Sequence, residues 1–385
     1  MTEDLIKSIQ QETRVLDMRR RSECMYYALR DRLNTVLPIA MRENGIDMWL
    51  ILCQEDNPDP VHRTMLPMDC WTPILQILLF YDQGPEKGIR RVNLSGTDTK
   101  DLFEQPYNGQ EEPQQWALLR KLVAELDPRR IGINIGSVQW SAGGLTYNLH
   151  QQLLQNLPGG YAQRLVPAEH ACTRWLETFT ADELQIYQHV VRIAHQIIVR
   201  CYSREAIIPG VTTITDLRWY YWQQCADRGL EVAFLPYFRV HHSPANQQKY
   251  GKTDPVIRQG DMVHCDVGIR YMGYNSDHQE WAYIVPAGQR EAPKGFQQLL
   301  QQANRLQDVF MAEFREGMTG NELLAKILQT ARAKGIPQPK VYSHNLGHLL
   351  HEPGPLIGLP WQQERCPGRG DVKLVYDSCF AMELC

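Results

Sequence analysis

The sequence has no excess of basic residues. Its 385 residues include 40 Lys and Arg against 44 Asp and Glu, a formal net charge of −4 at pH 7. Proteins that bind nucleic acid normally show a strong basic surplus or a basic stripe, so nucleic acid is not an expected partner. Hydrophobic residues make up 43% and charged residues 22%, which is typical of a folded chain with enough apolar residues for two cores.

Targeting and membrane-spanning signals are also missing. No run of eighteen apolar residues occurs, so no transmembrane helix and no membrane partner are expected. The first residues, Met1 to Leu5, are acidic and polar. They lack the basic stretch followed by an apolar run that is typical of a secretory signal. Ten cysteines are scattered without a Cys-x-x-Cys pair. We therefore expect reduced, buried thiols and a cytoplasmic protein.

The length suggests two domains, and the first is expected over residues 1–175. Short apolar runs there predict strands, and they alternate with segments that have helical periodicity. This alternation predicts an α/β layer arrangement. The predicted strands are Met48–Cys53, Ile74–Tyr81 and Arg130–Asn134, and the predicted helices are residues 1–35 and Trp116–Leu126.

The second domain, residues 176–385, contains an apparent internal repeat. An amphipathic helix over Asp182–Arg204 is followed by a Gly-x-Thr turn and a second helix to about Asp227. The same order returns with a helix over Gly295–Arg315, a Gly-x-Thr turn and a second helix to about Lys334. Threonine can cap the second helix in both copies. The pattern predicts a pseudo-twofold α+β domain; chance recurrence of a common helix–turn–helix pattern is the alternative.

Two aspartates lie in the most informative block. Two β-rich runs flank a Gly-containing centre, which predicts a hairpin that closes near Tyr271–Gly273. Asp266 and Asp277 would then lie nearly opposite each other, with Cβ atoms about 5 Å apart. Two carboxylates at that distance repel unless a proton or a cation lies between them. A pair of divalent metal ions would neutralise both carboxylates. Alternatively, both aspartates flank a turn and face water.

A second block holds three histidines within eight residues, although the whole chain has only twelve. These are His344, His348 and His351. Neutral imidazole is a common metal ligand and a usable proton carrier. One histidine alone could be a hydrogen-bonded core residue, but three together favour a site. A surface histidine cluster is the alternative.

A third block places Glu383 inside the apolar run Phe380–Leu384. An unpaired carboxylate is costly in such surroundings and requires a cation or a proton. The alternative is a chain end that frays into water.

The order of these residues resembles the motif series of metallopeptidase family M24. The residues are Asp266, Asp277, His344, His351 and Glu383. The family is the pita-bread group that includes creatinase, Xaa-Pro aminopeptidase and methionine aminopeptidase. The resemblance covers roughly residues 180–385. The preceding half resembles the creatinase-type N-terminal domain with weaker motifs. The resemblance implies an α/β N-terminal domain and a pita-bread catalytic domain.

The resemblance also implies a role for each residue. Asp266 would bind one metal ion, Asp277 would bridge two, and His344 and Glu383 would bind the second. Glu383 would also shuttle a proton from the attacking water, and His351 would hydrogen-bond the substrate or the tetrahedral intermediate. Alignment on Leu346-Gly347-His348 would make His348 the ligand. The seven-residue step to His351 favours His344 instead.

The implied function is that of a metal-dependent aminopeptidase or dipeptidase acting on Xaa-Pro-type peptides. Carboxylates with one histidine suit two divalent ions of Mn, Co, Zn or Fe. A creatinase-like hydrolase of a small guanidino or amide compound is the second possibility. A metal-free protein-binding module is the third. The resemblance also implies a homodimer.

The sequence departs from the family pattern at two places. Lys249 stands where relatives carry a substrate-contacting histidine, although His241 and His242 lie nearby. The chain also ends two residues after Glu383, where relatives continue through a strand with a second metal-bridging glutamate. From this resemblance we expect reduced stability and little activity of the 385-residue chain.

Overall fold

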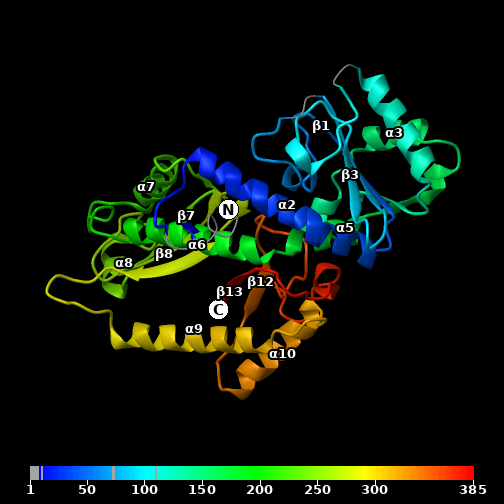
Figure 1. Ribbon diagram of the computed structural model, residues 1–385. Coiled ribbons are helices and arrows are strands. Elements are labelled where there is room, and N and C mark those ends of the chain that lie inside the picture. Colours follow the sequence, from blue (N-terminus) through cyan, green and yellow to red (C-terminus); the bar gives the residue numbers. More distant parts are fainter. Residues whose placement is uncertain (1–7, 10–11, 72–73, 109–110) are drawn as a thin grey trace.

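The computed structural model (Figure 1) describes residues 8–9, 12–71, 74–108 and 111–385. Part of the predicted helix over residues 1–35 therefore lies outside the described residues. Residues 12–17 are not helical, contrary to the prediction. Helix α2, Met18–Glu43, begins where the side chain of Asp17 accepts a hydrogen bond from the Arg20 backbone N–H at 3.0 Å. Such a cap satisfies one of the free N–H groups of the first turn.

Helix α2 ends later than predicted. It continues past residue 35 to Glu43 and passes through Pro38, although proline removes one backbone hydrogen bond from a helix. The turns around Pro38 bury Val36, Leu37, Ala40 and Met41. Burial of these side chains offsets the lost hydrogen bond, because each contributes about 1–3 kcal/mol.

The N-terminal half is built on a five-stranded mixed sheet in the order β3-β2-β1-β4-β5. The central strand β1 pairs antiparallel with β2 and parallel with β4. Its side chains are buried on both faces, which explains the continuous apolar run in the sequence. The strands are β1 (Met48–Gln54), β2 (Leu75–Asp82), β3 (Ile89–Asn93), β4 (Ile131–Ile133) and β5 (Leu165–Pro167).

Helices cover both faces of this sheet. Helices α3 (Glu112–Leu126) and α4 (Tyr147–Asn156) pack on one face, and α2 and α5 (Glu169–Glu177) pack on the other. The predicted α/β arrangement of the N-terminal half is therefore confirmed. The boundary proposed between residues 175 and 176 falls inside α5.

The C-terminal half contains the predicted helix–strand repeat. Its helices are α6 (Ala181–Cys201), α7 (Ile214–Ala226), α8 (Pro244–Tyr250), α9 (Lys294–Glu313) and α10 (Gly320–Ala333). Strands β7 (Tyr237–His241), β8 (Met262–Val267) and β11 (His278–Tyr283) form one sheet in the order β11-β8-β7. Strands β12 (Val341–Asn345) and β13 (Phe380–Leu384) form a second, and β6 (Glu231–Val232), β9 (Ile269–Tyr271) and β10 (Tyr274–Asn275) form a third.

The second helix of each copy begins with the same cap. Thr213 and Thr319 each accept a hydrogen bond from the third residue of the helix, and that residue's carboxylate reaches back to the threonine N–H. These reciprocal capping boxes set where α7 and α10 start. The threonine of the first copy is one residue later than Thr212, which ends the Pro-Gly-Val-Thr turn. The two copies form the pseudo-twofold pita-bread fold.

Helix α2 joins the two halves (Figure 1). Its first turns pack into the C-terminal core through Cys24 and Ala28, and its later turns cover the N-terminal sheet. Between these contacts, the buried guanidinium of Arg32 lies 2.9 Å from the Glu183 carboxylate in the first turn of α6. All ten cysteines are unpaired. Among the described residues, every helix is too short or too polar to span a bilayer.

Gly268, between β8 and β9, is expected to tolerate no side chain. A Cβ added there would lie 1.9 Å from the Ser276 carbonyl oxygen on the facing segment. Overpacking against backbone typically costs about 1–3 kcal/mol, so Gly268→Ala is expected to lower the free energy of unfolding by that amount. Gly295→Ala in α9 is the matched control, because no atom lies within 4 Å of its added Cβ. Urea denaturation of both variants checks this, and equal stabilities would contradict it.

Candidate metal centre

The hairpin that carries the two aspartates closes through Met272 and Gly273, which both have positive φ values, 51° and 80°. That geometry is typical of a two-residue hairpin turn. The register differs from the prediction, because Asp266 lies opposite Gln279 and not opposite Asp277. Asp277 precedes β11 and falls opposite Gly268. The two aspartates are therefore diagonal neighbours on one face of the sheet, where Cα atoms lie roughly 7–8 Å apart.

The other two predicted ligands come from the β12–β13 pair. Glu383 lies opposite Tyr342, and His344 follows two residues later on β12. Residues two apart on a strand share a face, so Glu383 and His344 are directed to the same side. The predicted burial of a carboxylate inside an apolar strand is only partial, because the side chain of Glu383 is 21% exposed.

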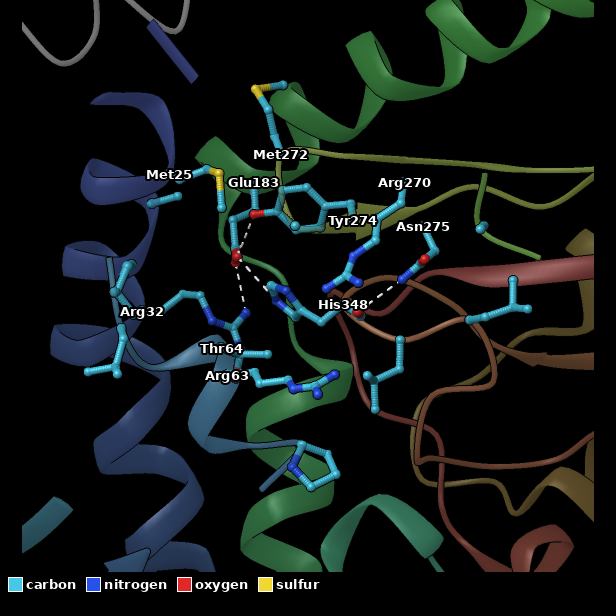
Figure 2. Close-up of a pocket in the computed structure, with 18 residues that line it drawn as sticks. Met25, Arg32, Arg63, Thr64, Glu183, Arg270, Met272, Tyr274, Asn275 and His348 are labelled. Atoms are coloured by element: carbon cyan, nitrogen blue, oxygen red, sulfur yellow. Dashed lines mark hydrogen bonds and ion pairs between the residues drawn. The ribbon is translucent and has the colours of Figure 1, made fainter. Parts of the chain in front are cut away.

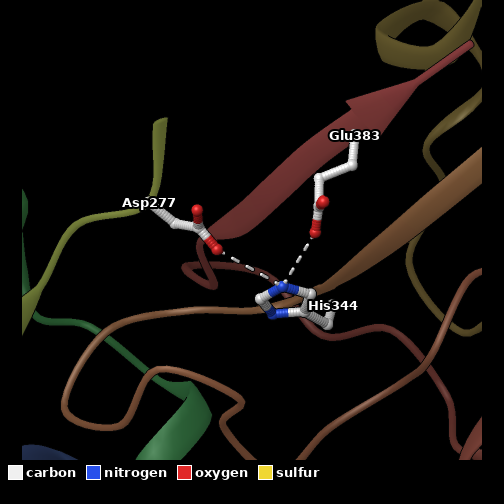
Figure 3. A group of neighbouring side chains, drawn as sticks. All are labelled: Asp277, His344 and Glu383. Atoms are coloured by element: carbon white, nitrogen blue, oxygen red, sulfur yellow. Dashed lines mark ion pairs between the residues drawn. The ribbon is translucent and has the colours of Figure 1, made fainter. Parts of the chain in front are cut away.

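Asp277, His344 and Glu383 converge (Figure 3), and each offers a ligand atom within 4.8 Å of the others. The Nε2 atom of His344 lies 3.3 Å from Glu383 Oε1 and 3.7 Å from Asp277 Oδ2. The imidazole is fully buried, and its Nδ1 donates to the Asn345 carbonyl at 2.9 Å. That bond requires a proton on Nδ1, so Nε2 is the ring nitrogen that faces the two carboxylates and is available to a metal ion.

Burial and mutual repulsion raise the pKa of both aspartates. Burial raises the pKa of Asp277 to about 7, the charges of Glu383 and Asp266 add to this, and His344 opposes it. Burial, followed by the charge of Glu383, raises the pKa of Asp266 to about 6. Asp266 is close enough to repel these carboxylates, but it lies outside the group of three that could hold an ion. The site thus gathers anionic oxygens at an energetic cost that a bound cation would remove.

His348 lies in different surroundings. Its ring stacks on Phe179 with an interplanar angle of 14°, and its Nε2 lies 3.4 Å from Glu183 Oε1. The structure therefore brings His344, and not His348, to the aspartate and glutamate. His351 is exposed at the residue level, and its ring centroid is 4.6 Å from that of His344.

The histidines near Lys249 have separate roles. His242 is bonded through both ring nitrogens, to Asp261 Oδ2 at 2.9 Å and to the Asp254 carbonyl at 2.8 Å, so it stabilises the loop around α8. His241 packs against Trp281, with ring centroids 5.0 Å apart. Lys249 is an exposed residue in α8.

Gln279 is a site neighbour that the sequence analysis missed. Its Nε2 donates to Glu383 Oε2 at 2.6 Å, and its Oε1 lies 3.0 Å from His264 Nε2. The amide thus occupies one oxygen of Glu383 and leaves the other facing His344. Once the register of β11 is known, the strand period of two identifies Gln279, because it lies two residues after Asp277.

A divalent cation fits this donor set. The Nε2 atom of His344 is buried without a hydrogen bond, and such an atom is costly unless it has a partner. Two carboxylates face the same point, and nitrogen with oxygen donors is suitable for Mn, Co, Zn or Fe. Asp277, His344 and Glu383 would hold the ion, with Asp266 beside them.

Comparisons with known proteins identify a family and a fold. The model of metallopeptidase family M24 matches residues 185–384. The X-Pro aminopeptidase of Thermotoga maritima superposes with a TM-score of 0.61 at 17% identity, covering 90% of each chain. A dipeptidase of Pyrococcus horikoshii gives 0.57 at 18%, covering 92% of this chain and 90% of its own. The N-terminal domain of the FACT subunit SPT16 from chickpea gives 0.53 at 11%, covering 93% and 88%.

The fold is thus that of the pita-bread aminopeptidases and prolidases. The chain belongs to metallopeptidase family M24. A search of curated proteins found no significant match. At these identities the structural likeness shows the fold alone.

Two buried carboxyl groups, those of Glu177 and Glu352, give a separate pH prediction. Burial raises the pKa of Glu177 to about 8 and that of Glu352 well above its ordinary value. The Glu177 carboxyl group therefore keeps its proton in the folded protein at pH 7, whereas the unfolded chain releases this proton above about 4.5. The unfolded state then binds fewer protons, so stability falls as pH rises from about 4.5 to 8.

Glu177→Gln removes this dependence without changing the shape of the side chain. Relative to wild type, the variant is expected to gain roughly 3 kcal/mol of stability between pH 4.5 and pH 7. Urea midpoints measured across that range test the gain. Glu125→Gln is the control at an exposed position and should show no pH-dependent difference. Parallel pH profiles for Glu177→Gln and wild type would show that the Glu177 carboxyl group is not protonated in the fold.

Proposed function

We propose that this chain is a metal-dependent hydrolase, an aminopeptidase or dipeptidase acting on Xaa-Pro-type peptides. The observation that carries the proposal is the buried Nε2 of His344, which faces Asp277 and Glu383 without a hydrogen bond. Membership of family M24 supports the reaction class. The X-Pro aminopeptidase and dipeptidase with the same fold support the substrate class.

Each side chain has a distinct part in this proposal. A pair of divalent ions, when bound, supplies an activated water at neutral pH and polarises the scissile carbonyl. Asp277 and Glu383 provide the anionic oxygens, and Asp266 supplies further negative charge beside them. The Nδ1 bond of His344 fixes its ring so that Nε2 faces these oxygens.

Proton transfer and substrate binding fall to the remaining groups. Glu383 would also accept the proton of the attacking water. The exposed His351, whose ring lies beside that of His344, donates to the substrate carbonyl and stabilises the charge that develops on it. Burial lowers the pKa of His351, which favours the neutral imidazole that donates through one nitrogen.

The test uses the full chain. Metal content and calorimetric titration with Mn²⁺ come first, because they report on the ligands without requiring turnover. Xaa-Pro dipeptides, longer Xaa-Pro peptides and creatine are then offered with the metal present. Metal-dependent cleavage of an Xaa-Pro bond is the expected result. Cleavage of creatine alone would favour a creatinase-like hydrolase, and failure to bind any divalent ion would favour a protein-binding module.

The assembly is proposed on the family resemblance, and the location on the ten unpaired cysteines. We propose a homodimer in the cytoplasm, with a peptide or small amide substrate as its partner. Light scattering on the purified chain tests the dimer, and a mass equal to one chain would contradict it.

A further inference from the structure

We propose that a cavity between the two halves of the chain binds a small carboxylic acid with a short apolar body. The cavity has a volume of about 310 Å³ (Figure 2). Its walls come from α2, the short helix at His62–Thr64, the β9–β10 hairpin and the loop after β12. None of Asp277, His344 and Glu383 lines it, so the cavity is separate from the proposed metal centre.

Charges deep in the cavity already balance. Arg32 and Glu183 are both buried and lie 2.9 Å apart. The other oxygen of Glu183 accepts a hydrogen bond from the Tyr274 hydroxyl at 2.8 Å, and the Thr180 backbone N–H also donates to the carboxylate at 2.8 Å. A second cation is therefore not needed at this depth, and the interior pair leaves no net charge for a ligand to neutralise.

Two further guanidinium groups at the rim of the cavity are not neutralised by a close carboxylate in the described part of the chain. Arg63 and Arg270 both line the cavity and are exposed, and Figure 2 shows them reaching toward it from opposite halves of the chain. Among the described residues, the Arg63 side chain has no hydrogen bond or ion pair. Arg270 approaches Glu231 only to 3.9 Å, with both side chains largely exposed, and such surface pairs contribute little. A carboxylate between two guanidiniums forms charge-assisted hydrogen bonds with both.

The rest of the lining identifies the remainder of the ligand. Apolar side chains from four separate segments face the space, namely Met25, Leu29, Leu66, Met272, Leu349 and Leu350. An inorganic anion would leave these side chains uncovered, whereas a hydrocarbon group of a few carbons would bury them. Pockets of this size and mixed character are typical of small-molecule sites. The shared requirement is an acidic head group on a compact apolar body.

Calorimetric titration of the full chain tests whether the cavity binds a small carboxylic acid. The probe is 4-methylpentanoate, and inorganic phosphate is titrated for comparison. The expected result is saturable binding of one 4-methylpentanoate per chain, with phosphate at least tenfold weaker. The double variant R63Q/R270Q should lower the affinity for 4-methylpentanoate at least tenfold. The control is R90Q/R365Q, which removes the same charge from two arginines that do not line the cavity, and it should stay within twofold of wild type.

Three outcomes would overturn the proposal. One is the absence of saturable binding, and another is phosphate binding as tightly as 4-methylpentanoate. The third is binding that survives R63Q/R270Q but is lost in D277N, which would place the carboxylate at the metal centre. The titrations are run with and without Mn²⁺. Neither measurement depends on peptide hydrolysis, so failure of the carboxylic acid to bind can be distinguished from failure of the proposed function.

Discussion

Replacing His344 with alanine is expected to abolish tight binding of divalent metal by this chain. The imidazole is the only nitrogen donor in the described group of three, and its Nε2 faces both Asp277 and Glu383. Loss of groups that merely orient metal ligands lowers affinity about 10–100-fold. Loss of a direct ligand is therefore expected to lower the affinity for Mn²⁺ by about 100-fold or more, and any metal-dependent hydrolysis of Xaa-Pro peptides should fall at least as far.

The chain provides a matched control four residues later. His348 is also buried, but it faces Glu183 and stacks on Phe179. His348→Ala should leave the affinity for Mn²⁺ within about threefold of wild type, although it removes the same type of side chain from the same segment. Calorimetric titration of both variants, with circular dichroism to verify the fold, decides between them. Loss of metal binding in His348→Ala and its retention in His344→Ala would reverse the assignment.

Local patterns in the sequence were sufficient for much of the fold. Apolar runs marked the central strands, and helical periodicity marked α6, α7, α9 and α10 to within a few residues. The family motif named His344 and Glu383 as partners, although 39 positions separate them in the printed sequence. Their convergence depends on the pairing of β12 with β13, which the spacing of the residues does not reveal.

The register of the hairpin that carries Asp266 and Asp277 could not be predicted from the sequence. The turn was placed correctly near Met272, but the axis of the hairpin lies between Met272 and Gly273. A shift of the turn centre by one residue moves every cross-strand partner by two. Asp266 therefore faces Gln279, and the amide that holds Glu383 could not be named before that register was known. Arg32 and Glu183 are 151 residues apart in the sequence. No local pattern in the sequence therefore indicates that they form a pair.

Replacing Arg32 with methionine is expected to be the most destabilising single change outside the metal centre. The guanidinium is buried, donates to Glu183 Oε2 at 2.9 Å and to the Thr178 carbonyl at 2.5 Å, and lies over the Trp175 ring at 4.3 Å. Its removal leaves the Glu183 carboxylate buried without a cation. Breaking a buried pair in this way costs about 3–5 kcal/mol, which urea denaturation at pH 7 would detect directly.

The pH dependence separates loss of the charge pair from loss of packing. Burial alone would raise the pKa of Glu183, but the charge of Arg32, the nearby His348 ring and the hydrogen bond from the Thr180 N–H outweigh it and lower that pKa to about 2. The pair therefore contributes its full stabilisation above about pH 4.5 and loses it as pH falls toward 2. The difference between wild type and Arg32→Met should shrink over that range.

Two further variants complete the test of the Arg32–Glu183 pair. Arg200→Met breaks the Arg200–Glu205 pair, whose side chains are 43% and 55% exposed, so it should change the stability little. Adding Glu183→Gln to Arg32→Met should recover part of the loss at pH 7, because the buried charge is then removed. If Arg32→Met were as mild as Arg200→Met, or if its effect did not depend on pH below 4.5, the attachment of α2 to α6 would rest on apolar packing and not on this pair.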